Sequence, residues 1–255
     1  MNRTVLITGA TSGIGQSCAL QFAKNNFNLI LTGRRIDRLT ALKAALEEQY
    51  KSEVQILCFD VRNLEETKQA IASIDMTRFP VIDILINNAG LASGMSSIDE
   101  GDYDDWNVMI DTNVKGLLHV SREVMPIMKR QGCGHIVNIS STAAKDVYAK
   151  GNVYCATKHA VDALSKSMRI DLLPYGIKVT SVNPGACETE FSLVRFKGDE
   201  ERAKAVYEGF TPLTPGDVAD TIYYACNLPK HVCINDLTLT CLTQANAHYT
   251  IKKTV

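Results

Sequence analysis

Short runs rich in Val, Ile and Leu alternate with longer amphipathic stretches along the whole chain, and this alternation limits the possible folds most. Almost continuous apolarity in the runs is typical of strands buried on both faces. Helical spacing of apolar residues recurs between them, as at Leu39, Leu42 and Leu46, and at Val161, Leu164, Met168 and Leu172. The order predicts an α/β fold with a doubly wound parallel sheet of about seven strands and helices on both faces. The expected strands are Val5–Thr8, Leu29–Thr32, Val54–Phe59, Ile84–Ile86, His135–Ile139, Ile177–Val182 and Leu237–Leu242.

The chain has 255 residues and no Pro/Gly/Ser-rich linker, which predicts one domain over residues 1–255. A formal net charge of −1 gives no basis for a broad nucleic-acid or membrane-binding surface. The eight cysteines are scattered without a C-x-x-C pair, so we expect reduced thiols and no metal site. The first residues lack an apolar core long enough for a secretion signal, and a cytoplasmic protein is expected.

One charged stretch, Ser192–Gly209, interrupts the alternation between the last two expected strands. We expect it to be helical. A long insertion beside a site often acts as a lid, and the region around 190–212 is a candidate for that role. The equally open alternative is a plain solvent-exposed surface helix.

A glycine-rich turn, TGATSGIG, follows the first expected strand and is followed directly by a helical pattern. Such a turn lets the backbone at a helix N-terminus approach a pyrophosphate. A dinucleotide is therefore expected here rather than a purely structural turn. The candidate binding residues are Gly9, Thr11, Ser12, Gly13, Ile14 and Gly15.

The second expected strand ends in basic residues, Arg34 and Arg35, where a carboxylate would favour NAD. A guanidinium can bind the 2′-phosphate of NADP with two hydrogen bonds. NADP is therefore the expected cofactor; the alternative is two exposed arginines at a helix start. Asp60 and Val61 follow the third strand and are expected to border the adenine, although Asp60 could instead cap the helix expected over Leu64–Ser73.

Tyr154 and Lys158 are four residues apart in a helical pattern, so their side chains share one helix face. A phenol with an unperturbed pKa of about 10 is a poor base at neutral pH. A nearby ammonium favours the phenolate and so brings the phenol closer to the range in which it can exchange protons with a substrate. The pair is a candidate for general acid/base chemistry.

Together with the glycine turn, several further motifs resemble the short-chain dehydrogenase/reductase family over essentially the whole chain. They are Asn87-Asn88-Ala89-Gly90, Asn113, the segment NISS ending at Ser141, Tyr154-x-x-x-Lys158 and Asn183-Pro184-Gly185. The resemblance implies a single-domain Rossmann-like fold and hydride transfer between nicotinamide and a carbonyl or alcohol carbon.

The resemblance also implies roles for individual residues. Ser141, favoured over its neighbour Ser140, would hold the substrate oxygen, and Tyr154 would exchange the proton. Lys158 would bind the nicotinamide ribose, and Asn113 would help to hold a water-linked proton relay. The residues expected to shape the rest of the cofactor pocket are Asn87, Ala89, Gly90, Pro184, Gly185 and Thr189.

The segment from Thr189 to Asp199, with LTPGDVAD and LPKHVCIND, is similar to the NADP-dependent 3-hydroxy acid dehydrogenases of that family. This resemblance implies small substrates such as serine, L-allo-threonine or 3-hydroxypropionate. A carboxylate needs a cationic partner, for which Arg195 is the candidate. The alternative for Arg195 is a surface salt bridge with Asp199 or Glu200.

Two other functions stay open. One is an NADPH-dependent carbonyl reductase of 3-oxoacyl or other ketone substrates, and the other, less favoured, is a non-catalytic NADP-binding sensor. Some residues depart from the commonest pattern: Cys155 follows Tyr154, and Cys187 could alter substrate fit or sensitivity to oxidation. Lys145 is expected to place a charge near the substrate entrance.

Assembly is implied mainly by the resemblance, which points to a homotetramer or a homodimer. Contacts are expected through the last strand, Leu237–Leu242, and through the helices near Asn113 and Tyr154. Pairing across an edge strand would cover unpaired backbone groups. The C-terminal segment AHYTIKKTV could be disordered or reach a neighbouring subunit.

Overall fold

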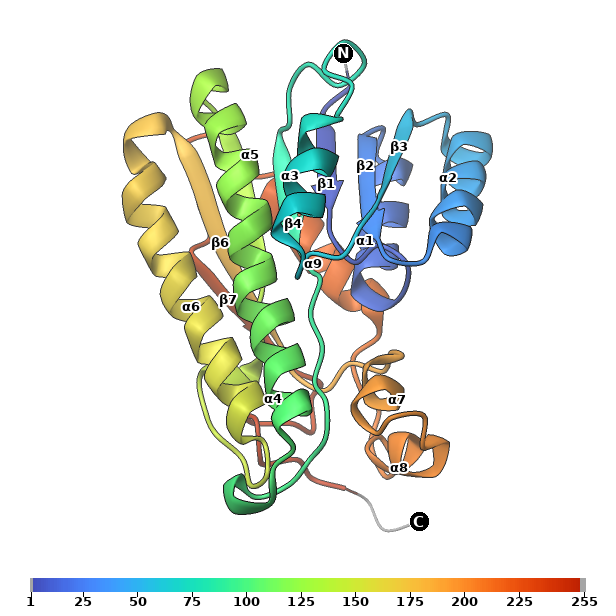
Figure 1. Ribbon diagram of the computed structural model, residues 1–255, viewed down its shortest axis with the longest axis vertical. Helices are drawn as coiled ribbons and strands as arrows, with labels where there is room; N and C mark the ends of the chain where they lie inside the picture. Colours follow the sequence, from blue (N-terminus) through green and yellow to red (C-terminus); the bar gives the residue numbers. More distant parts are fainter. Residues whose placement is uncertain (1, 253–255) are drawn as a thin grey trace.

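The computed structural model describes residues 2–252 and contains one sheet of seven parallel strands, drawn in Figure 1. The strand order is β3-β2-β1-β4-β5-β6-β7, so the chain reverses its winding between β1 and β4. All seven predicted strands are present, most with ends shifted by one or two residues. The strands are β1 (Thr4–Ile7), β2 (Asn28–Gly33), β3 (Val54–Cys58), β4 (Ile84–Asn87), β5 (Gly134–Ile139), β6 (Ile177–Pro184) and β7 (Asp236–Leu239).

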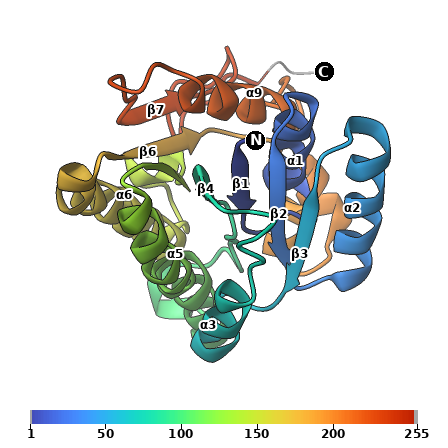
Figure 2. The same cartoon turned by 90° about the horizontal axis from the view of Figure 1, so that it is seen from above.

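Helices cover both faces of this sheet, as the view from above shows (Figure 2). One face packs against α1 (Gly13–Lys24), α2 (Ile36–Tyr50) and α9 (Pro215–Cys226). The other packs against α3 (Leu64–Ala72), α5 (Leu117–Gln131) and α6 (Asn152–Leu172). The doubly wound architecture predicted from the alternation is confirmed.

Alternate side chains of the central strand β1 enter the two cores. Val5 and Ile7 pack on the side of α1 and α9, whereas Leu6 packs with α5 and α6 residues on the other side. All three are fully buried. This explains why the strands read as continuous apolar runs. The helix faces predicted around Leu39 and Val161 point into these cores.

The last strand is shorter than predicted: β7 ends at Leu239 instead of Leu242. Its ladder with β6 ends at the pair Pro184–Leu239, and Gly185 then donates the final backbone hydrogen bond to Leu239 O (2.8 Å). Because β6 ends there, residues beyond Leu239 have no strand to pair with. Leu242 is completely exposed.

The region 192–209 is not one helix but two, α7 (Phe191–Arg195) and α8 (Glu200–Ala205). Between them Lys197 and Gly198 adopt left-handed φ angles of 54° and 93°, which ends the first helix. The pair forms a small lobe below the sheet in Figure 1, beside the carboxyl ends of the strands. Asp199 caps α8 by accepting a hydrogen bond from Arg202 N (3.0 Å).

The C-terminal segment folds back on its own chain as far as residue 252. Ile251 N donates to Thr243 O (2.9 Å), and Lys252 Nζ donates to Ala205 O and Val206 O (both 3.2 Å) at the end of α8. The last three residues of the predicted tail lie outside the described residues. Within residues 2–252 no helix is long and apolar enough to cross a membrane.

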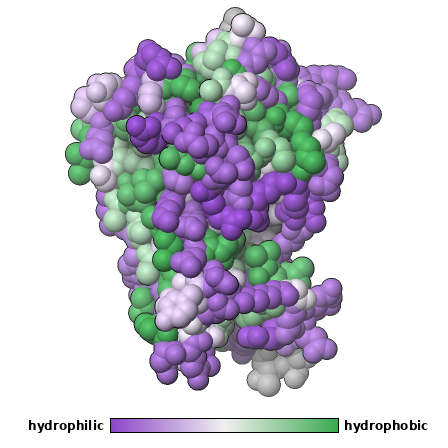
Figure 3. Space-filling model, in the orientation of Figure 1, coloured by the Kyte–Doolittle hydropathy of each residue, from purple (hydrophilic) through white to green (hydrophobic). Residues whose placement is uncertain are grey.

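Hydrophilic residues cover much of the face seen in Figure 3, with smaller apolar patches between them. Large exposed apolar side chains include Ile98, Tyr103, Ile110 and Leu118, which lie on and around α4 (Tyr103–Ile110) and at the start of α5. All eight cysteines are free thiols. Cys18, Cys155, Cys226 and Cys241 are buried.

Candidate active site

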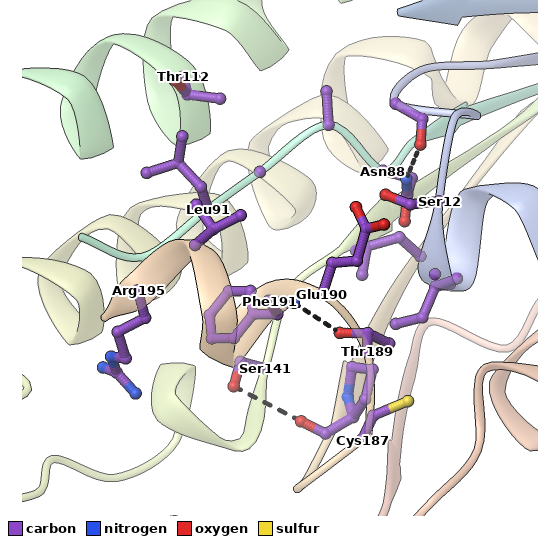
Figure 4. A pocket seen from close by; sticks show the side chains of 18 of the residues that line it. Ser12, Asn88, Leu91, Thr112, Ser141, Cys187, Thr189, Glu190, Phe191 and Arg195 are labelled. Carbon is purple, nitrogen blue, oxygen red and sulfur yellow. Dashed lines mark hydrogen bonds between the residues drawn. The ribbon is translucent and has the colours of Figure 1, made fainter. Parts of the chain in front are cut away.

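A cavity of about 500 Å³ lies outside the carboxyl ends of the strands, where the winding reverses between β1 and β4. Ligands of open α/β sheets bind in this position. Eighteen of the predicted site residues line it. They are Gly9, Thr11, Ser12, Gly13, Ile14, Arg34, Arg35, Asp60, Val61, Ala89, Gly90, Ser141, Tyr154, Lys158, Pro184, Gly185, Thr189 and Arg195. Figure 4 shows part of this lining, in which Ser12, Ser141, Thr189 and Arg195 are labelled.

The glycine turn forms one wall of the cavity at the N-terminus of α1. Its geometry is fixed by Asn88, whose Nδ2 donates to Thr8 O (2.9 Å) and Gly9 O (3.1 Å). Ser12 is the N-cap residue, and its hydroxyl accepts a hydrogen bond from Arg35 Nη2 (2.9 Å) rather than capping the helix. The N-terminus of α1, which is the positive end of the helix dipole, faces the cavity.

Gly15 does not line the cavity, but it allows the turn to close. A Cβ atom at this position would lie 2.4 Å from Gly9 O and 2.5 Å from Asn88 Nδ2. We expect Gly15→Ala to lower the free energy of unfolding by about 1–3 kcal/mol, because the turn must move to relieve these contacts. Urea unfolding measures the change.

Gly216→Ala is the control for this variant, since its added Cβ would meet only Thr214 Oγ1 at an ordinary 3.5 Å. It should change the unfolding free energy little. Equal stability of the two variants would show that the close contact at Gly15 is not a constraint.

The two arginines after β2 have different surroundings. The guanidinium of Arg35 is already hydrogen-bonded within the protein: it donates to Thr11 Oγ1, Ser12 Oγ and Glu190 Oε2 at 2.9–3.2 Å. Arg34 is 59% exposed and has only a loose contact of 3.7 Å from Nη1 to Asp60 Oδ2. Arg34 is thus the more available of the two for an incoming phosphate.

Glu190 was not singled out from the sequence, yet it joins the lobe to this wall. Its carboxylate accepts from Arg35 Nη1 (3.0 Å) and Arg38 Nη1 (2.7 Å). These bonds with Arg38 and Arg35 keep the pKa of Glu190 below its usual value. No spacing in the sequence links residues 35, 38 and 190.

Asp60 lines the cavity beside Val61, but it does not cap the helix that follows. The N-cap of α3 is Asn63, whose side chain accepts from Glu65 N and Glu66 N. Asp60 instead holds Arg62 Nη2 and Nε at 2.6–3.1 Å. The capping alternative for Asp60 is therefore wrong.

Tyr154 and Lys158 lie on the first turns of α6 with their side chains in the cavity, only 8% and 6% exposed. Lys158 Nζ is 5.8 Å from the centre of the Tyr154 ring and donates to Ile139 O (3.0 Å) at the end of β5. Burial lowers the pKa of Lys158 to about 8. Burial raises the pKa of Tyr154, while a hydrogen bond with Ser141 and the charge of Arg195 lower it.

Ser141 begins the loop after β5, and its hydroxyl accepts from Ala143 N (3.1 Å). It also donates to Pro184 O (3.5 Å), and its proximity to Tyr154 acts to lower the pKa of that phenol. The neighbouring Ser140 is buried and donates to Lys158 O (3.3 Å). The geometry therefore favours Ser141 over Ser140 as the serine that meets a substrate.

Two predicted asparagines lie behind the cavity rather than in its lining. Asn113 is in a π-helical turn, Asp111–Gly116; its amide donates to Leu91 O (2.8 Å) and Thr157 Oγ1 (3.0 Å), and it accepts from Leu91 N (2.9 Å). Asn87 donates to Ser121 Oγ and Asn138 Oδ1, both at 2.9 Å, beneath the site. Asn87 is not in the lining of the cavity, and its hydrogen bonds tie β4 to its neighbours.

Arg195 ends α7 and lines the cavity, at the opposite end from Ser12 and Asn88 in Figure 4. Its Cζ is 5.2 Å from the centre of the Tyr154 ring. The alternative, a salt bridge with Asp199 or Glu200, is wrong: Asp199 caps α8, and Glu200 faces Lys204 (3.7 Å).

Lys145 does not place a charge at the entrance, contrary to expectation. Its ammonium contacts Asp162 and Asp236, both at 2.7 Å, and it is absent from the lining of the cavity. Cys187 does line the cavity, but burial raises its pKa to about 12. A protonated thiol is a weak nucleophile, which opposes the expected sensitivity to oxidation.

Further lining residues were missed because their positions depend on long-range packing. Phe191 packs on the Tyr154 ring, with centroids 5.5 Å apart, and Tyr148 approaches from the loop before α6. Gln244 of the C-terminal segment accepts from Ala186 N (2.8 Å) across the floor. Within residues 2–252 no cluster of three or more metal-ligating side chains was found.

The wall formed by the glycine turn, the buried pair Tyr154 and Lys158, and Ser141 beside them are the parts of a dehydrogenase-type site. The short chain dehydrogenase family matches residues 3–199. The chain belongs to this family.

Within the family the chain is similar to serine 3-dehydrogenase of Agrobacterium fabrum (strain C58), at 42% identity over 98% of both chains. It is 43% identical to the NADP-dependent 3-hydroxy acid dehydrogenase YdfG of Escherichia coli K12, over 95% of this chain and 96% of that one. Among solved structures, the closed form of serine dehydrogenase complexed with NADP+ superposes with a TM-score of 0.91, at 41% identity, and covers 98% of this chain and 100% of that chain.

Proposed function

We propose that this protein is an NADP(H)-dependent oxidoreductase that interconverts a small 3-hydroxy acid and its 3-oxo acid. The observation that carries the proposal is the position of the Arg195 guanidinium, 5.2 Å from the ring of Tyr154 at the substrate end of the cavity. A positive charge beside the reacting group fits an acid substrate better than a neutral one. Relatives named for serine and 3-hydroxy acids support the same substrate class.

The residues along the cavity fit NADP from end to end. The open N-terminus of α1 suits the pyrophosphate, Arg34 is available for the 2′-phosphate, and Lys158 lies within reach of the nicotinamide side. When bound, the nicotinamide ring supplies the site that accepts or gives the hydride. The remaining lining residues around it would be Ala89, Gly90, Pro184, Gly185 and Thr189.

The chain's own residues would handle the substrate oxygen and its proton. Ser141 holds the oxygen by a hydrogen bond, and Tyr154 Oη takes the hydroxyl proton in oxidation or returns it in reduction. The Lys158 ammonium stabilises the phenolate form of Tyr154. Asn113 hydrogen-bonds Leu91 and Thr157 behind this group, where it would help to hold a water-linked proton relay.

Selectivity for NADP should depend on Arg34. We expect Arg34→Ala to raise the KM for NADP about 10- to 100-fold, because a charge-assisted bond to the phosphate is lost, with little change for NAD. Steady-state kinetics with both cofactors measure the ratio. Arg78→Ala, which removes an exposed arginine paired with Glu53, serves as the control; equal loss with NAD and NADP would contradict the role of Arg34.

The assay that tests the function is NADP reduction with L-serine, L-allo-threonine, threonine isomers and 3-hydroxypropionate. Each should be oxidised faster with NADP than with NAD. Turnover confined to neutral ketones or sugars would favour the carbonyl-reductase alternative. NADP binding without any turnover would favour the non-catalytic sensor. The presence of Ser141, Tyr154 and Lys158 together argues against that alternative.

We further propose a lid role for the lobe around 190–212, a cytoplasmic location and a homotetramer. The lobe supplies Glu190, Phe191 and Arg195 to the cavity wall, and the free thiols suit a reducing compartment. The exposed apolar residues near α4 and the open edge of β7 are surfaces that a second copy could cover. Light scattering of the purified protein gives the assembly size.

A further inference from the structure

The Arg195 guanidinium lies among three aromatic rings and, within residues 2–252, forms no ion pair with a carboxylate. Its Cζ lies 5.5 Å from the ring centre of Tyr148 and 5.9 Å from that of Phe191, in addition to Tyr154. Among residues 2–252, its Nε is a buried donor with no hydrogen-bond acceptor. A half-buried guanidinium with an unpaired donor favours binding an anion, because the rings replace only part of the hydration that it loses on burial.

One polar side chain does contact this guanidinium: the hydroxyl of Tyr148 accepts a hydrogen bond from Arg195 Nη2. Tyr148 lies in the loop between η3 (Thr142–Ala144) and α6, and it lines the same cavity as Ser141 and Tyr154. The contact therefore joins this loop to the end of α7 across the substrate side of the cavity.

The position of the Tyr148 ring depends on a glycine three residues later. Gly151 N donates to Tyr148 O (3.0 Å) in a tight turn, and a Cβ at residue 151 would lie 2.3 Å from Tyr148 Cε2. Any other residue at position 151 would displace the ring from the cavity wall. The turn thus holds the phenol against Arg195.

A phenol that accepts a hydrogen bond still has its own hydrogen to donate. Burial raises the pKa of Tyr148, so its hydroxyl stays protonated at neutral pH. The bond accepted from Arg195 also polarises the O–H group and makes it a better donor. Arg195 therefore provides a positive charge, and Tyr148 beside it provides a neutral hydrogen-bond donor. Such a pair suits the two oxygens of a carboxylate.

We infer that Tyr148 is a substrate-binding residue whose hydroxyl donates a hydrogen bond to the substrate carboxylate while Arg195 neutralises its charge. The inference rests on the proposed 3-hydroxy acid activity and adds a second donor to the carboxylate site. A purely structural alternative is that the Tyr148 ring only supports Arg195 by stacking. The phenylalanine variant separates the two, because it keeps the ring and removes the hydroxyl.

The experiment compares oxidation of 3-hydroxypropionate with that of its neutral amide, 3-hydroxypropionamide, by wild type and Tyr148→Phe. We expect kcat/KM for the acid to fall about 10- to 100-fold, mainly through KM, as for loss of a hydrogen bond to a charged group. The amide should lose clearly less, because its carbonyl oxygen can accept only a neutral hydrogen bond from the phenol. Tyr224→Phe, at a 60% exposed tyrosine on α9, is the matched control, and NADP binding with thermal melting confirms that each variant is folded.

A double variant, Tyr148→Phe with Arg195→Ala, adds a second measurement. If both groups bind one carboxylate, the combined loss should be smaller than the product of the single losses. An unchanged KM for the acid in Tyr148→Phe, or equal losses for acid and amide, would overturn the inference and leave the proposed function in place. A wild type that oxidises none of the acids would overturn both.

Discussion

Tyr154→Phe should lower turnover of 3-hydroxy acids by about 10²- to 10⁴-fold while leaving NADP binding nearly intact. The variant removes the hydroxyl that takes the proton from the substrate, and general acid/base catalysis typically contributes a factor of that size. The ring remains, so its contacts with Phe191 and Arg195 are kept. Steady-state rates with NADP, together with cofactor titration by fluorescence, measure the two effects separately.

The pH profile gives this prediction a second readout. Burial raises the pKa of Tyr154, so phenol predominates at neutral pH and the phenolate needed for oxidation forms as the pH rises. Wild-type oxidation should therefore accelerate with alkaline pH, by up to about tenfold per pH unit while the phenol is mostly protonated. Tyr154→Phe should lose this rise, whereas Tyr224→Phe should keep both rate and profile. A phenylalanine variant with wild-type rates would refute the mechanism.

Arg195→Ala should lower kcat/KM for 3-hydroxy acids about 100-fold, equivalent to ~3 kcal/mol. The variant removes the positive charge at the substrate end, and a carboxylate there would then be desolvated without a charge to offset it. Neutral substrates such as 3-hydroxypropionamide need no such partner and should lose far less. Parallel kinetics on acid and amide measure the difference.

The matched control for this variant is Arg202→Ala. Arg202 also lies over an aromatic ring, 4.5 Å from the centre of Phe196, but it is outside the cavity lining. Arg195→Met, which keeps most of the side-chain bulk, separates loss of charge from loss of packing. Equal losses for acid and amide in Arg195→Met would remove the carboxylate role.

The parts of the fold predicted correctly from the sequence are those set by local periodicity and by fixed spacing along the chain. The seven strands and the helix faces around Leu39 and Val161 follow from runs of apolar residues. The glycine turn, Arg34 and the Tyr154–Lys158 pair could be placed because each directly follows or lies within one such element.

The features that were missed or wrong depend on contacts between distant segments. Lys145 is drawn away from the entrance by Asp162 and Asp236, and nothing near residue 145 indicates the second of these partners. Tyr148 reaches the cavity only because Gly151 and Arg195 hold it there. The break between α7 and α8 at Gly198 is different, because it could have been predicted locally: glycine favours the left-handed φ found there.

The short helix α7 connects two kinds of recognition that are usually considered separately. Glu190, just before it, accepts hydrogen bonds from Arg35 and Arg38, beside the proposed adenosine end of the cavity. Arg195, its last residue, is the proposed partner of the acid substrate. Because only the five residues of α7 separate Glu190 from the end at Arg195, we expect a shift at one end to move the other. Substitutions at Arg35, which would release Glu190, should therefore be expected to alter the preference among acid substrates as well.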